Sequence, residues 1–227
     1  MNKSRLIIGL FLLGWLASPV KGQESKVVRD LRLWTGVEVE KEVKNWTFSL
    51  KEEMRLKTNI SEINNYFTQV GIRYSISRNF ALTAKYRYTR DKNNDGNYEN
   101  RSRYNLDLRY RGRLDFITVD YRLRYQKEVE SMRLFDLEEP YEKYVRNRIS
   151  VRYTDLRKLE PYVSGEIFQL FMMYQLPRFH YYRIQAGISV EPGNFGEFRI
   201  AWGFNREINA VAPATIYMFR VNYIYSF

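Results

Sequence analysis

Apolar and polar residues alternate along most of this chain with a period of two. Residues 103–111 show the pattern clearly, because the apolar or aromatic side chains there fall on even positions and the polar ones on odd positions. Residues 117–126 repeat it, with Ile117, Val119 and Tyr121 on the apolar parity. Alternate residues of a strand face opposite sides of a sheet, so the spacing predicts strands with one apolar and one polar face. A helical period fits these segments less well.

Eleven segments follow this rule, and most are 11 to 15 residues long. They are about 30–40, 45–57, 64–76, 79–90, 101–111, 114–126, 143–154, 160–174, 179–191, 196–207 and 214–227. Such lengths are roughly twice those of strands in soluble proteins and match strands that cross a bilayer at a tilt.

The expected connections alternate in length. Short ones fall at about 77–79, 111–114 (around Gly112), 155–160 and 191–196, and longer ones at about 91–100, 127–142, 172–179 and 207–214. Transmembrane barrels have this asymmetry, with tight periplasmic turns and longer outer loops, and bacterial ones normally have an even number of strands. The prediction is therefore an all-β fold, a transmembrane antiparallel up-and-down barrel of ten or twelve strands, with one segment miscounted.

A soluble barrel such as a lipocalin has the same alternation but buries its apolar face inside. The membrane barrel is favoured by aromatic residues toward the strand ends, such as Trp46, Tyr74 and Tyr110, which would form interfacial girdles. The chain also ends on the alternating aromatic residues Tyr223, Tyr225 and Phe227. That ending resembles the signal read by the barrel-assembly machinery of the outer membrane.

The N-terminus has the features of a secretory signal peptide. Lys3 and Arg5 precede an apolar run of 11 residues, Leu6 to Leu16, which small residues follow. We predict residues 1–22 as signal peptide and 23–227 as the barrel, exported to the outer membrane of a Gram-negative bacterium. A single membrane anchor is the alternative, but a span requires about 18 apolar residues.

Composition removes several other classes. The chain has no cysteine, so a disulfide framework, a Cys-ligated zinc site and a thiol nucleophile are excluded. A hydrophobic content of 44% excludes a disordered chain. Without Lys3, Arg5 and Lys21 there remain 34 basic residues against 26 acidic ones, a net charge of about +8. Nucleic-acid binding is disfavoured because the arginines alternate through strands instead of clustering.

Several short motifs appear in an order that resembles one family. They are Trp34 to Glu38, Glu52 to Leu56, Val70 to Tyr74, Tyr86 to Tyr88, Tyr121 to Tyr125, Arg146 to Arg148 and Pro161 to Glu166. The chain is similar to an uncharacterised family of small outer-membrane barrels, a domain of unknown function. The resemblance implies the fold and the location and offers no catalytic residues.

The polar parity carries an excess of basic residues. The candidate lumen-lining residues are Arg55, Arg73, Arg87, Arg109, Asp120, Arg122, Arg124, Arg146, Arg148, Glu166 and Arg183, and Glu38, Lys85, Asp107, Arg152, Arg199 and Arg220 share their parity. One interpretation is a cationic pore that favours small anionic solutes. The other is an Arg–carboxylate network that fills a narrow barrel. Both describe a non-enzymatic protein without cofactor or metal, whose partners are outer-membrane lipids and the assembly machinery.

Two further features suggest chemistry. His180, beside the loop at 172–179, would be the base of an outer-membrane enzyme with a rim site acting on lipid or peptide, although a lone His among aromatics is more often interfacial. Residues Asp91 to Gly96 match the first half of a calcium loop, but Ser102 stands where the bidentate Glu belongs. A turn rich in Asn, Asp and Gly explains the same residues.

Overall fold

The computed structural model describes residues 29–93, 95–129, 142–156, 158–172, 176–193 and 195–227. The predicted signal peptide lies outside them. The strands are β1 (Arg29–Val43), β2 (Trp46–Lys57), β3 (Glu62–Ser75), β4 (Phe80–Lys92), β5 (Tyr98–Leu114), β6 (Ile117–Val129), β7 (Glu142–Tyr153), β8 (Leu159–Phe171), β9 (Arg178–Val190), β10 (Glu197–Glu207) and β11 (Thr215–Ser226). Each corresponds to one predicted segment. The described part of the chain contains no helix that could span a bilayer.

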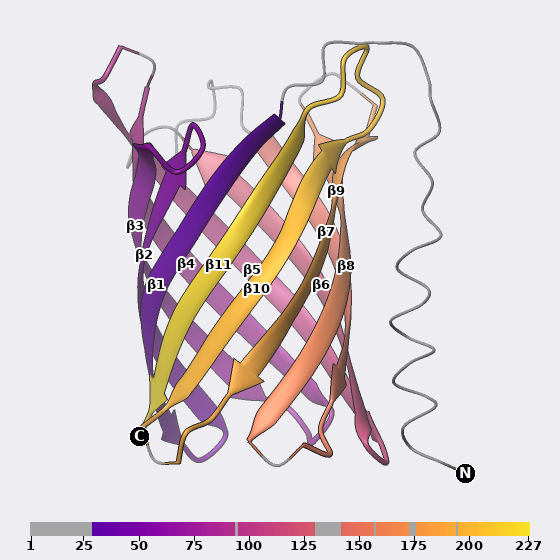
Figure 1. Ribbon diagram of the computed structural model, residues 1–227. Coiled ribbons are helices and arrows are strands. Elements are labelled where there is room, and N and C mark those ends of the chain that lie inside the picture. Colours follow the sequence, from indigo (N-terminus) through magenta and orange to yellow (C-terminus); the bar gives the residue numbers. More distant parts are fainter. Residues whose placement is uncertain (1–28, 94, 130–141, 157, 173–175, 194) are drawn as a thin grey trace.

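The strands form one closed barrel in sequence order (Figure 1). Neighbours in the chain pair antiparallel, and β1 closes the ring on β11 in parallel, with Trp34 opposite Arg220. The all-β barrel is confirmed, but the expected count of ten or twelve is wrong, because the described residues form eleven strands. With an odd number of alternating strands the first and the last run in the same direction, so the closing pair must be parallel.

The difference in connection length between the two ends is smaller than predicted: four residues join β2 and β3 at one end, and six join β9 and β10 at the other. One end, at the bottom of Figure 1, carries the C-terminus and short connections such as the two residues Lys44 and Asn45 between β1 and β2. The opposite end carries the connections 58–61 and 208–214; of those at 93–97 and 172–177 only part is described, and the predicted loop at 127–142 falls largely outside the described residues. We call these the short-turn end and the long-loop end.

The turn expected around Gly112 lies three residues later. Gly112 is inside β5, opposite Val119, and the turn is formed by Asp115 and Phe116. Asp115 has a φ of 52°. Asp tolerates this left-handed backbone, which a two-residue hairpin turn requires, so the glycine is not needed there.

The outer face of the barrel is apolar. Val37, Leu50, Val70, Leu106 and Ile149 each expose 48 to 55% of their surface. Polar residues of the opposite parity, among them Gln69, Asn105 and Ser189, are buried inside. This distribution is the reverse of a soluble barrel, in which the apolar parity would be inside.

Aromatic pairs follow the outer face near both ends. Near the short-turn end, the ring centroids of Trp46 and Tyr74 are 4.6 Å apart and those of Phe198 and Tyr223 are 4.9 Å apart. Near the long-loop end, the rings of Tyr182 and Phe204 are 6.0 Å apart. The apolar belt therefore lies between two aromatic zones.

Candidate functional site inside the barrel

The eleven candidate lumen-lining residues all point into the barrel, because they occupy the parity opposite to the exposed apolar face. They come from β2 to β9 and include both basic and acidic side chains. The partners of each decide whether they form an open polar channel or a packed network.

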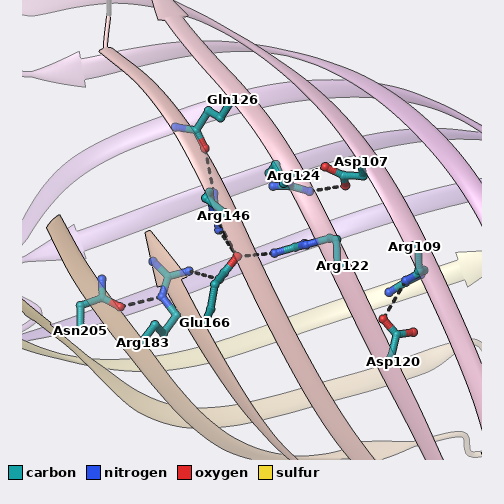
Figure 2. Close-up of polar contacts among 10 residues, drawn as sticks. All are labelled: Asp107, Arg109, Asp120, Arg122, Arg124, Gln126, Arg146, Glu166, Arg183 and Asn205. Carbon is teal, nitrogen blue, oxygen red and sulfur yellow. Dashed lines mark hydrogen bonds and ion pairs between the residues drawn. The ribbon is translucent and has the colours of Figure 1, made fainter. Parts of the chain in front are cut away.

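Glu166 on β8 is the centre of one group of contacts (Figure 2). Its Oε1 accepts hydrogen bonds from Arg122 Nη2 on β6, at 2.6 Å, and from Arg146 Nε on β7, at 3.1 Å. Arg183 Nη1 on β9 lies 3.7 Å from Oε2. The Glu166 side chain is only 4% exposed. One buried carboxylate thus binds guanidinium groups from three other strands; we call it the Glu166 centre.

The remaining bonds of these arginines reach neutral side chains. Arg146 Nη1 donates to Gln126 Oε1 at 2.8 Å, and Arg183 Nε donates to Asn205 Oδ1 at 2.6 Å. The planar guanidinium can serve several acceptors at once because its donors point in fixed directions. These bonds hold the arginines in place around Glu166.

Two further acids pair along β5 and β6 in Figure 2. Arg124 Nη2 donates to Asp107 Oδ2 at 2.6 Å, and Arg109 Nε donates to Asp120 Oδ1 at 2.9 Å. Arg111 also reaches Asp120. Each bond joins neighbouring strands, so these pairs line the wall between β5 and β6.

A second centre, around Glu53 on β2, was missed by the sequence analysis. Lys51 Nζ and Arg55 Nε lie 2.8 Å from its two carboxylate oxygens, and the Glu53 side chain is 1% exposed. Only Arg55 of this Glu53 centre was recognised. The signal was present, because residues 51, 53 and 55 share one parity of a predicted strand.

Other inward acids, most of them not recognised from the sequence, reduce the basic excess inferred there; Glu38 was among those recognised. Arg73 bonds to Glu40 at 3.3 Å, and Arg103 pairs with Glu128 at 2.6 Å. Further pairs are Lys85–Glu38, Arg101–Asp91, Arg152–Glu160 and Arg199–Glu197. Much of the polar interior is therefore an ion-paired network.

Aromatic rings inside the barrel stack with the guanidinium groups. Arg87 lies 3.5 Å from the ring centroid of Phe67 and donates to Gln69 Oε1 at 2.8 Å. Arg146 lies 4.3 Å from the Phe168 ring. Trp34, 6% exposed, is contacted by Arg55 at 4.0 Å and by Arg183 at 5.2 Å. Cation–π contacts of this kind are stabilising, and more so when desolvated.

Arg148 and Arg220 differ from the other inward arginines. Among the described residues neither has a hydrogen bond or an ion pair to a side chain, although Arg220 lies 5.2 Å from the Trp34 ring. Arg148 stands directly between Arg122 and Glu166 in the strand register. The network is therefore not balanced everywhere.

The remaining candidate features are His180 and the loop from Asp91 to Gly96. His180 Nδ1 lies 2.9 Å from Tyr144 Oη, and their rings stack, beside Tyr181 and Phe168 near the long-loop end. Arg101 lies 3.5 Å from both Asp91 and Glu99, and Asn93 Oδ1 accepts bonds from the backbone of the loop. The described residues contain no group of His, Cys, Asp and Glu that could hold a metal ion.

These features define the class: a closed β-barrel with an apolar outside and a charged, ion-paired inside. Residues 31–205 match the family described as "Protein of unknown function (DUF2490)", and the chain belongs to this family. This confirms the resemblance seen in the sequence to an uncharacterised barrel family.

Similarity to a solved structure supports the barrel fold and says nothing about function. A solved structure described as a "Bacterial polysaccharide outer membrane secretin" superposes with a TM-score of 0.50 at 10% identity. The match covers 74% of this chain and 60% of that chain. No curated protein matches the sequence.

Proposed function

We propose that this protein is a non-enzymatic outer-membrane barrel whose interior is sealed by side chains, and which serves as a structural or surface-interaction barrel at its long-loop end. The location is supported by the exposed apolar belt, by the aromatic zones near both ends, and by the signal peptide predicted from the sequence. The superposed secretin is named as an outer-membrane protein.

Arginine substitutions at two depths test the location. Leu106 and Leu114 are both exposed on β5, one near its middle and the other at the short-turn end. Leu106→Arg should lower the free energy of unfolding in lipid vesicles by about 2 to 4 kcal/mol, and Leu114→Arg by about 1 kcal/mol or less, because the cost of a charge falls toward the interface. Equal costs, or a monomer that stays soluble without detergent, would contradict the membrane location.

One chain of contacts carries the proposal of a sealed interior. Glu53 on β2 and Glu166 on β8 lie on opposite walls, because five or six strand steps separate them in either direction. Arg55 links Glu53 to the Trp34 ring, and Arg183 links the same ring to Glu166. Side chains therefore bridge the barrel from wall to wall, which agrees with the small interior expected for a barrel little wider than eight strands.

Planar-bilayer recordings test the seal, and two tryptophans provide a matched pair. The wild-type barrel should show no steady conductance. Trp34→Ala removes the ring at the crossing and should give discrete open events, whereas Trp202→Ala, on the outer face, should stay silent. Steady conductance of the wild type would contradict a sealed barrel.

A narrow channel that favours anions is the second candidate. It is supported by two inward arginines, Arg148 and Arg220, that make no hydrogen bond or ion pair to a side chain among the described residues, because rings of basic residues select anions. In the same recordings this candidate expects a conducting wild type with anion preference. Cation preference would contradict both candidates.

An alternative function is that of an outer-membrane enzyme with an active site at the rim of the barrel. His180 would be the base of such an enzyme; its Nδ1 lies 2.9 Å from Tyr144 Oη, and a hydrogen bond there would orient the ring and leave Nε2 to accept a proton. The C-terminal residues Tyr225 and Phe227 stack on each other, with ring centroids 6.1 Å apart, beside the closing pair of strands. We propose that this end engages the barrel-assembly machinery, so Phe227→Ala should slow insertion while leaving the stability of the refolded barrel nearly unchanged.

A further inference from the structure

The inner wall of β5 to β10 carries a lateral row of charged residues. Following the strand register from β5 to β9, the row reads Arg109, Arg122, Arg148, Glu166 and Arg183, and Asn205 follows on β10. Four arginines therefore stand side by side with a single carboxylate. Like charges directly opposite one another on neighbouring strands are destabilising.

The acids around the row do not balance it. Asp120 neutralises Arg109, and Glu166 is shared by Arg122, Arg183 and, from the adjacent row, Arg146. Arg148 makes no hydrogen bond or ion pair to an acid among the described residues although it lies next to Glu166 in register, because Arg122 reaches past it to that carboxylate. Two or more positive charges therefore remain without a counter-charge.

Buried donor atoms in this region also lack acceptors. The Nε atoms of Arg122 and of Arg220 are inaccessible to solvent and have no hydrogen-bond partner. Arg220 and Arg183 each lie 5.2 Å from the Trp34 ring. Arg183 also lies 3.7 Å from Glu166, the carboxylate that Arg122 binds and next to which Arg148 stands in register, so these guanidinium groups surround one part of the inner wall. The excess charge and the free donors thus occur at the same place.

A guanidinium group does not lose its proton at physiological pH, so the excess cannot be relieved by ionisation. Water can accept the hydrogen bonds but supplies no counter-charge, and an uncompensated buried charge is strongly destabilising. The fork of guanidinium donors matches the oxygens of carboxylate, sulfate or phosphate groups. A multiply charged oxyanion satisfies both the charge and the donors.

We propose that Arg122, Arg148 and Arg220 form an oxyanion-binding site on the inner wall of the barrel. The site lies on the polar face, away from the outer apolar belt, so its ligand is a dissolved anion rather than a lipid headgroup. It goes beyond the proposed function, because a sealed barrel and a conducting one can each hold an anion at this place.

The test is titration calorimetry of the refolded full chain in non-ionic detergent, with sulfate as the probe and chloride at matched ionic strength as the reference. Saturable binding of sulfate is expected for the wild type. Arg148→Gln and Arg220→Gln should each weaken it about tenfold or more, since each removes a charge-assisted hydrogen bond. Arg152→Gln is the control, because Arg152 bonds to Glu160 near the short-turn end.

A stability measurement separates this site from a purely structural role. Without oxyanion and at low salt, Arg148→Gln should be at least as stable as the wild type, because it relieves repulsion among arginines. Added sulfate should raise the urea midpoint of the wild type more than that of the variant. The proposal is overturned if the wild type binds no sulfate, if Arg148→Gln binds it equally well, or if Arg152→Gln is weakened as much.

Discussion

Glu53 and Glu166 are both carboxylates inside the barrel, but they obtain their basic partners differently. Lys51 and Arg55 stand two residues before and after Glu53 on the same strand. The partners of Glu166 come from β6, β7 and β9. The first centre is built by local spacing, and the second exists only once four strands have assembled. Loss of the second should therefore loosen the barrel wall, whereas loss of the first affects mainly β2.

The largest effect is expected from Glu166→Gln. Three guanidinium groups would lose a buried counter-charge at once, and breaking a buried ion pair typically costs about 3 to 5 kcal/mol. The free energy of unfolding, from urea titrations in vesicles containing only chloride as anion, should fall by that amount. A loss below about 1 kcal/mol would show that water already screens this centre.

Glu53→Gln should cost less, about 1.5 to 3 kcal/mol, the range for hydrogen bonds to charged groups. Arg55 keeps its contacts with the Trp34 and Phe67 rings, and Lys51 keeps its bond to Asn222. The same urea titration in vesicles measures this loss in the free energy of unfolding. If Glu53→Gln and Glu166→Gln lower the free energy of unfolding equally, a centre built within one strand is worth as much as one built from four strands. That result would contradict the difference expected between the two centres.

Arg183→Lys tests whether the planar guanidinium group, and not only its charge, stabilises the Glu166 centre. Lysine retains the charge but loses the bond from Nε to Asn205 and stacks less well on Trp34 and Phe168. We expect a loss of about 1 to 2 kcal/mol in the free energy of unfolding. Arg206→Lys, at an exposed position on β10, serves as the control and should be neutral.

The smallest effect is the coupling between the two centres. Their arginines Arg55 and Arg183 meet at the Trp34 ring, so a double-mutant cycle of Glu53→Gln and Glu166→Gln should give about 0.5 kcal/mol. In a Trp34→Ala background the coupling should vanish. A coupling that persists without the ring would mean that the two walls communicate by another route.

Much of the fold follows from the periodicity of the chain. A two-residue period determines which side chains share a face, and strands of 11 to 17 residues leave few architectures other than a large barrel. The prediction of an even strand number was wrong because it rested on the strand number usual in other bacterial barrels and not on the residues of this chain. The turn at Asp115 was displaced because a glycine inside a strand and a glycine in a turn look alike in sequence.

The sequence by itself determined the parity of every inward arginine and placed Lys51, Glu53 and Arg55 on one face, since positions two apart in a strand always point the same way. Only the tertiary structure decided that Arg122 reaches past Arg148 to Glu166, and that Arg55 and Arg183 meet on Trp34. The physical reason is that a period fixes directions along one strand. The stagger between strands and the closure of the ring decide which charges come within bonding distance.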